Sequence, residues 1–191
     1  WLRDADGLWS INHFTVDEDL VKEAPNLKVI AQASVGYDNI DIDALTARHI
    51  PYGNTPDVLT ETTAELAFTL MAAASRRIYE NAQFVKAGKW AERPSNIKGK
   101  DLSRMTLGII GMGKIGVSVS RRARAFGMTV QYHNRNRRND DSLLMTTYVS
   151  LGKLLTTSDV ILVMAPLTEE SYHLIDAEAF EMMKETALFV N

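Results

Sequence analysis

The chain has 191 residues, of which 46% are hydrophobic and 24% charged, an ordinary globular composition with enough apolar residues for one or two cores. The formal net charge of −3 gives no electrostatic case for binding nucleic acid or an anionic membrane. With no cysteine and no apolar run long enough to cross a membrane, the sequence excludes disulfides and a thiolate nucleophile and predicts a cytoplasmic protein.

Short strands and helices alternate in the first part of the chain. Strands are predicted at Gly7–Ser10, Leu27–Ala33 and Ile50–Asn54, and helices at Val16–Ala24 and from Asp41 or Asp43 to about His49. Thr15 is the predicted N-cap of the first helix, and Pro25 stops it. Thr55 and Pro56 then break the pattern.

A long helical stretch follows, from Val58 to Lys86, with an expected interruption near Ser75 and Arg76. Small and apolar residues in it predict burial on more than one side; they are Ala64, Leu66, Ala67, Leu70, Ala73 and Ala74. After Gly88, the polar stretch 91–103, with Pro94 and Gly99, predicts a surface excursion between two halves.

The most informative motif is the run Gly111-Met112-Gly113-Lys114-Ile115-Gly116, which matches the dinucleotide fingerprint G-x-G-x-x-G. It directly follows an apolar predicted strand, 105–110, and opens into a predicted helix, 117–126. This placement between strand and helix predicts a dinucleotide site.

Each glycine of the run has a mechanical role in such a site. Gly111 permits the tight turn, Gly113 lets the backbone approach a pyrophosphate, and Gly116 lets the helix pack closely on the strand. The pyrophosphate would lie on the free N–H groups of the helix N-terminus.

The segment after the next predicted strand, 129–132, points to the type of cofactor. It reads His133-Asn134-Arg135-Asn136-Arg137-Arg138, and no acid follows until Asp140. An NAD site usually has a carboxylate here for the ribose 2′-OH, whereas a guanidinium can bind a 2′-phosphate. The segment therefore favours NADP over NAD, with Asn134, Arg135 and Asn136 as cofactor-binding candidates. A solvated basic loop is the alternative.

The remaining elements complete an alternating pattern. Strands are predicted at Thr146–Val149, Val160–Met164 and Ala187–Val190, and helices at Leu151–Leu155, capped by Ser150, and at Asp176–Met183. Such alternation predicts an α/β fold, a doubly wound parallel sheet with helices on both faces.

Several motifs in register now support a family resemblance. They are Ser34-Val35-Gly36-Tyr37-Asp38-Asn39, the segment Asn54 to Glu65, Gly88-Lys89-Trp90, the glycine run, and Pro166-Leu167-Thr168. Their order and spacing resemble the D-isomer-specific 2-hydroxyacid dehydrogenases over essentially the whole chain. Ser34–Asn39 and Asn134-Arg135 resemble the glyoxylate/hydroxypyruvate reductase subgroup, which includes enzymes acting on 2-ketogluconate.

The resemblance implies NADPH-dependent reduction of a small 2-oxo acid (glyoxylate, hydroxypyruvate or 2-ketogluconate) to the D-2-hydroxy acid by hydride transfer. Residues 1–56 would form part of a smaller flavodoxin-like substrate domain. Residues 57–191 would form a linking helix and part of a Rossmann-type dinucleotide-binding domain. Both ends look cut, which predicts a fragment of a longer protein. That protein would be a homodimer, with 58–86 in the interface.

Site residues follow from the same resemblance. The backbone N–H groups at Val35 and Gly36 would hold the substrate carboxylate; an ordinary strand-end turn is the alternative. Pro166 would border the cofactor ribose, although proline is also common punctuation after a strand. For Thr60 and Thr63, helix capping and packing are favoured over contact with the nicotinamide.

No catalytic residue is predicted within the chain. The family's Arg, Glu and His would lie beyond Asn191, and the four histidines present match no catalytic motif. No metal site is predicted, because no His, Asp and Glu residues show ligand spacing.

Two other functions stay open. One is an NAD-dependent relative of another substrate class, such as a phosphoglycerate or D-lactate dehydrogenase. The other is a corepressor-like scaffold that senses a dinucleotide.

Overall fold

The computed structural model describes residues 2–11, 13–92 and 97–191, so Pro94 of the predicted excursion lies outside the described residues. The chain divides into two compact units, Trp1–Leu59 and Thr60–Asn191. The predicted boundary between a substrate part and a nucleotide part, at residues 56 and 57, lies three residues before this division. The function assigned to each unit stays a prediction.

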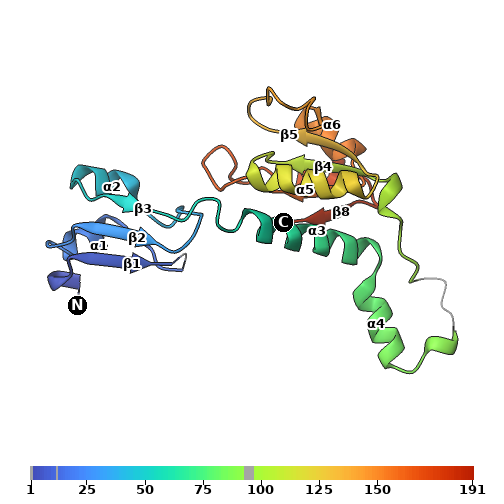
Figure 1. Cartoon of the computed structure of the whole chain (residues 1–191), viewed down its shortest axis with the longest axis horizontal. Coiled ribbons are helices and arrows are strands. Elements are labelled where there is room, and N and C mark those ends of the chain that lie inside the picture. The colour runs from blue at the N-terminus through green and yellow to red at the C-terminus, as the bar shows by residue number, and fades with distance from the viewer. Residues whose placement is uncertain (1, 12, 93–96) are drawn as a thin grey trace. The chain divides into compact units, whose positions relative to one another are not determined.

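The first unit is a small parallel sheet with two short helices (Figure 1). Its elements are the 3-10 turn η1 (Leu2–Asp4), β1 (Gly7–Ser10), α1 (Glu18–Glu23), β2 (Val29–Gln32), α2 (Ile42–Ala47) and β3 (Tyr52–Gly53). The strand order is β1-β2-β3, and both pairings are parallel. Apolar residues from every layer form its core, among them Val16, Val21, Ile30, Leu45 and Ile50.

The start of α1 differs from the prediction. The N-cap is Asp17, whose side chain accepts a hydrogen bond from the Leu20 amide, and Thr15 does not cap the helix. Val16 is fully buried and forms a parallel bridge with Ile40, so its backbone is extended and the helix cannot begin before it. In α2 the cap is Asp41, one of the two predicted residues.

The long helical stretch of the second unit consists of α3 (Thr60–Ser75) and α4 (Ile78–Lys86), which confirms the predicted interruption. The break lies at Arg77, whose φ of 50° is left-handed and incompatible with a continuous helix. One face of α3 is buried through Ala64, Ala67 and Met71. Leu66 and Leu70 are exposed, so the prediction of burial on more than one side is wrong for this chain.

The second unit is built on a five-stranded sheet of order β6-β5-β4-β7-β8, and every pairing in it is parallel. The strands are β4 (Thr106–Ile110), β5 (Thr129–His133), β6 (Thr147–Tyr148), β7 (Val160–Val163) and β8 (Leu188–Val190). The helices between them are α5 (Lys114–Ala125), α6 (Leu151–Thr157) and α7 (Ala177–Met182), and the 3-10 turns η2 (Trp90–Glu92) and η3 (Leu102–Arg104) precede β4.

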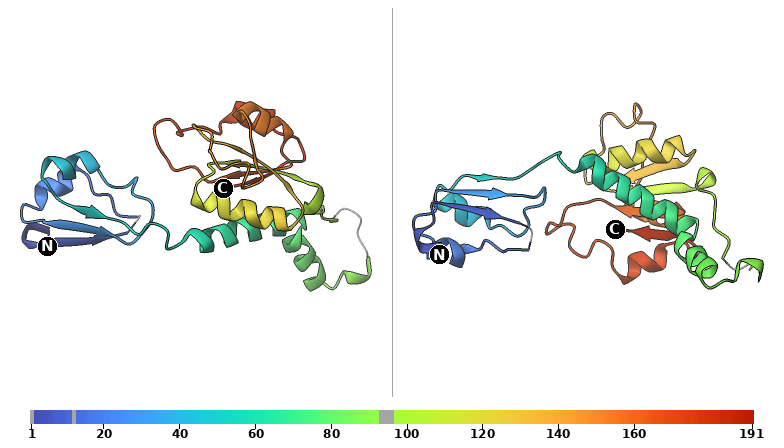
Figure 2. Two further views of the ribbon diagram at one scale, coloured as in Figure 1. Left: turned by 45° about the horizontal axis from the view of Figure 1, so that its top comes forward. Right: turned by 60° about the horizontal axis from the view of Figure 1, so that its bottom comes forward.

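Helices cover both faces of this sheet (Figure 2). Residues of α3 and α5 join one apolar core, through Ala67, Met71 and Val119. Residues of α6 and α7 join another, through Leu154 and Ala179. The doubly wound parallel fold predicted from the sequence is therefore confirmed.

Strand β4 sits in the middle of the sheet and contributes to both cores. Leu107 and Ile109 belong to the core with α3 and α5, and Ile110 belongs to the core with α6 and α7. Side chains alternate between faces along a strand, so Gly108 lies on the α6 face. A Cβ on Gly108 would meet the Leu154 side chain at 2.7 Å, which shows how closely α6 approaches the strand.

Within the part of the chain that the structure describes, no helix is long and apolar enough to cross a membrane.

Candidate dinucleotide site

The strand order places a topological switch point beside the glycine run. The chain runs outward from β4 through β5 to β6, then returns to the other side of β4 as β7. The loops that leave β4 and β7 therefore diverge at a topological switch point, where open α/β sheets bind ligands. The two loops touch, because a Cβ on Gly111 would lie 2.6 Å from backbone atoms of Met164 and Ala165.

The three glycines differ in the space around them. Gly111 has a φ of 98°, in the left-handed region that strains other residues. A Cβ on Gly116 would lie 2.6 Å from the Gly111 carbonyl oxygen and 3.3 Å from Ile109, so this glycine lets α5 pack against β4. Gly113 has no atom within 4 Å of a Cβ position, which leaves open space for a ligand to approach the backbone.

Helix α5 begins directly at this open position. Gly113 is its N-cap, and no side chain caps the helix within the described residues. Lys114 and Ile115 occupy its first turn, and the amide N–H groups of a first turn point out of the end of the helix. These amides and the helix dipole favour a bound anion. The turn Gly111–Gly113 and the first turn of α5, called the glycine cradle below, therefore suit the pyrophosphate of a dinucleotide.

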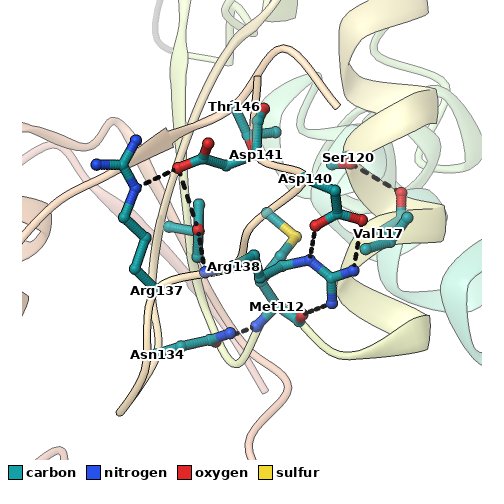
Figure 3. A network of polar contacts seen from close by, with 10 residues as sticks. Met112, Val117, Ser120, Asn134, Arg137, Arg138, Asp140, Asp141 and Thr146 are labelled. Atoms are coloured by element: carbon teal, nitrogen blue, oxygen red, sulfur yellow. Dashed lines mark hydrogen bonds and ion pairs between the residues drawn. The ribbon is translucent and has the colours of Figure 1, made fainter. Parts of the chain in front are cut away.

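The glycine loop is held from the side by residues that follow β5 (Figure 3). The Met112 amide donates a hydrogen bond to Asn134 Oδ1 at 2.6 Å, and Arg138 Nη1 donates to the Met112 carbonyl at 3.0 Å. Met112 itself is fully buried. Asn134, predicted to bind the cofactor, therefore shapes the loop, and its carboxamide oxygen already has a partner.

Two arginines of the basic segment have close acidic partners. Arg137 Nε lies 2.7 Å from Asp141, whose side chain is 8% exposed, and Arg138 binds Asp140 through two nitrogens at 2.7 and 2.8 Å (Figure 3). Hydrogen bonds from these guanidinium groups hold the pKa of each carboxyl below its ordinary value. The acids are thus ionised and neutralise Arg137 and Arg138.

Arg135 has a different environment. Its side chain is 78% exposed, and its ion pair is with Glu170, at 3.5 Å. Asn136 and Pro166 are also exposed, and Pro166 follows β7 in the loop at the switch point. Of the three arginines, Arg135 has the longest distance to its acidic partner and the most exposed side chain.

The predicted substrate-binding residues, Val35 and Gly36, lie in the first unit. They follow β2 in an exposed loop. The carbonyl oxygens of the loop accept hydrogen bonds from Gln32, Ser34 and Asn54. A Cβ on Gly36 would lie 3.3 Å from Asp38 Oδ1, a tight approach to a flexible side chain.

Sequence reasoning missed the residues that hold these loops. Gln32 and Asn54 bind the loop after β2, and Asp140, Asp141 and Glu170 pair with the three arginines. For Gln32 and Asn54, the position of a carboxamide at the end of a predicted strand could have indicated a role in holding the loop. For the three acids the sequence contains no such signal, because their pairing depends on the path of the turn.

Among residues 2–11, 13–92 and 97–191, no group of three His, Cys, Asp or Glu residues could hold a metal ion. His133 Nδ1 lies 3.0 Å from the Val149 carbonyl oxygen, and its ring stacks on Tyr148.

Comparison with known proteins gives the same family for most of the second unit. Residues 68–191 match the family model described as the D-isomer specific 2-hydroxyacid dehydrogenase, NAD binding domain. A glyoxylate reductase of Korarchaeum cryptofilum is 47% identical over 193 residues, covering all of this chain and 58% of that protein. The chain thus spans little more than half the length of the curated relatives it matches.

Solved structures of similar proteins match this chain over 98% or more of its length. A D-lactate dehydrogenase of Aquifex aeolicus, complexed with NAD and lactic acid, superposes with a TM-score of 0.95 at 33% identity, over all of this chain and 57% of that one. A glyoxylate reductase of Paecilomyes thermophila gives a TM-score of 0.89 at 36% identity, over 98% and 58% of the two chains.

Proposed function

Because the chain belongs to the D-isomer specific 2-hydroxyacid dehydrogenase family, we propose that its protein reduces a small 2-oxo acid to the D-2-hydroxy acid with a nicotinamide cofactor. The observation that carries the proposal is the glycine cradle at the switch point, where Gly113 leaves its backbone open in front of α5. The glyoxylate reductases among the relatives support the substrate class.

The bound nicotinamide would supply the hydride, and the protein would supply binding and orientation. In this chain the first turn of α5, with Lys114 and Ile115, would bind the pyrophosphate. Pro166 would border the ribose. Val35 and Gly36 would bind the substrate carboxylate through their amides.

We assign NADP(H) as the preferred cofactor. Arg135 is exposed and only weakly paired, so its guanidinium can form charge-assisted hydrogen bonds with a 2′-phosphate. Arg137 and Arg138 are neutralised by Asp141 and Asp140 and do not offer a second site of equal strength. No carboxylate for the 2′-OH of NAD stands between His133 and Arg138, the segment after β5 where an NAD site usually has one.

The substrates we propose are glyoxylate, hydroxypyruvate and 2-ketogluconate. We also propose that the full-length protein is a homodimer. Large apolar side chains are exposed along α3, α4 and the turn after them, and a second copy would cover them: Leu66, Leu70, Ile78, Tyr79, Val85 and Trp90.

One specific observation favours a second candidate, an NAD-dependent D-lactate dehydrogenase. The Aquifex aeolicus structure, an NAD complex, superposes on the whole chain. The absence of an acid at Asn134–Arg138 counts against this candidate.

The test is reduction of glyoxylate, hydroxypyruvate, 2-ketogluconate and pyruvate by the purified full-length protein, with the configuration of the product determined by chiral chromatography. Turnover of one of the first three to the D-2-hydroxy acid supports the proposal. Preference for pyruvate supports the second candidate, and cofactor binding with no turnover of any 2-oxo acid indicates a dinucleotide-sensing scaffold.

A further inference from the structure

We propose that Asn54 is a positioning residue for substrate binding, which acts with Gln32 by turning the amides of the loop after β2 outward as a binding site for a carboxylate. This inference rests on the proposed function of the Val35–Gly36 loop. It assigns to two carboxamide side chains a role in affinity for the 2-oxo acid.

Asn54 holds the middle of the loop. Its Nδ2 donates a hydrogen bond to the Val35 carbonyl oxygen at 2.9 Å. The next residue, Thr55, donates its amide to the Ser34 carbonyl oxygen at 3.0 Å. The segment after β3 thus binds two successive carbonyl groups of the loop.

The third carbonyl is bound from β2. The Gly36 carbonyl oxygen accepts from Gln32 Nε2 at 3.0 Å and from the Ser34 hydroxyl at 2.8 Å. The Gln32 side chain is fixed in turn, because it donates to Asn39 Oδ1 at 2.7 Å and accepts from the Ser10 hydroxyl. Gln32 is 2% exposed, so its own side chain is shielded from water.

Three bound carbonyls determine where three amides point. All the described peptide bonds are trans, and in a planar trans peptide the C=O and N–H groups point in opposite directions. The amides of Val35, Gly36 and Tyr37 therefore face away from Thr55, Asn54 and Gln32. All three residues are exposed, and none of the described residues accepts a hydrogen bond from these amides.

Consecutive outward amides form a concavity that binds anions. The ligand chemistry that fits is a small carboxylate, the anionic group of a 2-oxo acid. Without the Asn54 hydrogen bond, the peptide between Val35 and Gly36 is free to rotate. The loop would then lose its prearranged amide, and carboxylate affinity would fall while the glycine cradle of the second unit stays intact.

The experiment compares Asn54→Ala with Asn26→Ala in the full-length protein. Asn26 is a matched control, since its Nδ2 also donates to a backbone carbonyl at 2.9 Å, that of Arg3, in the same unit. The readouts are the KM for glyoxylate, the inhibition constant of oxamate (a non-reducible carboxylate analogue), the KM for the cofactor, and Tm.

We expect Asn54→Ala to raise the KM for glyoxylate and the inhibition constant of oxamate about ten-fold, with the cofactor KM within about two-fold of wild type. Asn26→Ala should change neither the KM for glyoxylate nor the inhibition constant of oxamate. Ser34→Ala removes one of two donors to the Gly36 carbonyl and should raise both values about two- to three-fold. This variant keeps the test decisive if Asn54→Ala misfolds.

The inference would be overturned if Asn54→Ala left the KM for glyoxylate and the inhibition constant of oxamate unchanged, or raised the cofactor KM equally. Where Asn54→Ala does not fold, unchanged values of the same two constants in Ser34→Ala would overturn it. Failure of the proposed function is a separate result, since the wild-type protein would then reduce no 2-oxo acid.

Discussion

Arg135 Nη1, in the loop after β5, lies 3.5 Å from a carboxylate oxygen of Glu170, in the loop after β7. Both side chains are mostly exposed, 78% for Arg135 and 67% for Glu170. A hydrogen bond from the Thr168 side chain is the main cause that lowers the pKa of the Glu170 carboxyl, and the positive charge of Arg135 lowers it by less. This loose pair is the one that a 2′-phosphate would have to replace.

Loss of Arg135 should weaken NADPH binding. A hydrogen bond to a charged group contributes about 1.5–3 kcal/mol, so Arg135→Ala should raise the Kd of NADPH by roughly ten- to a hundred-fold and leave that of NADH nearly unchanged. Arg137→Ala is the control, because Arg137 is already bound to Asp141. The Kd values are measured by fluorescence titration. An equal rise in the Kd values of NADPH and NADH would show that Arg135 does not bind the 2′-phosphate.

Removal of the acid from the Arg135 pair should have the opposite effect. Glu170→Gln frees the guanidinium and should lower the Kd of NADPH by up to about five-fold, the range expected for an exposed ion pair. Glu169→Gln removes the neighbouring charge and serves as the control. If the two variants bind NADPH equally well, Glu170 does not compete with the cofactor.

Two glycines of the β4 region should separate binding from stability. Gly113→Ala fills the open approach and should weaken NADPH at least about ten-fold, with little change in Tm. Gly108→Ala overpacks the contact with Leu154 and should lower the free energy of unfolding by about 1–3 kcal/mol. Thermal denaturation and cofactor titration check both. A large fall in Tm for Gly113→Ala would assign that glycine to folding.

The contact between α3 and α5 should depend on pH. Glu61 accepts hydrogen bonds from Ser118 and Arg122, and these hold its pKa below its ordinary value. A lowered folded pKa gives stability that is present above the ordinary carboxyl pKa and is lost as pH falls through the folded value.

Glu61→Gln should therefore lower Tm by about 1–3 °C at pH 7, and its difference from wild type should shrink as pH falls below about 4. Glu65→Gln, whose oxygen lies 3.4 Å from Arg122, is the control one turn along α3 and should have a smaller effect. A difference between Glu61→Gln and wild type that is constant from pH 7 to about pH 3 would contradict this interpretation.

Periodicity and glycine spacing were enough to predict the sheet. The strand before the glycine run and the helix after it were predicted because apolar runs and turn signals are local. The helix α5 begins at Lys114, earlier than predicted, because the last glycine of the run is itself helical. The error at Thr15 had a long-range cause, the bridge between Val16 and Ile40.

Side-chain partners could not be predicted in the same way. In the sequence, Asp140 is only the first acid after the basic segment, and the turn brings Asp140 and Asp141 to Arg138 and Arg137. The roles of Asn54 and Gln32 likewise depend on the pairing of β2 with β3, which brings the two segments together. His133 and Asn134 are adjacent in sequence, yet His133 faces Val149 and Asn134 faces the glycine loop.

The most direct test of an NADP(H)-dependent reductase is the ratio of kcat/KM for NADPH to kcat/KM for NADH, measured with glyoxylate in the full-length protein. The double variant Asn134→Asp with Arg135→Ala keeps an acceptor for the Met112 amide and puts a carboxylate where the 2′-OH of NAD can bind it. We predict a ratio above one in wild type and below one in the variant. A wild-type preference for NADH, or an unchanged ratio in the variant, would contradict the account.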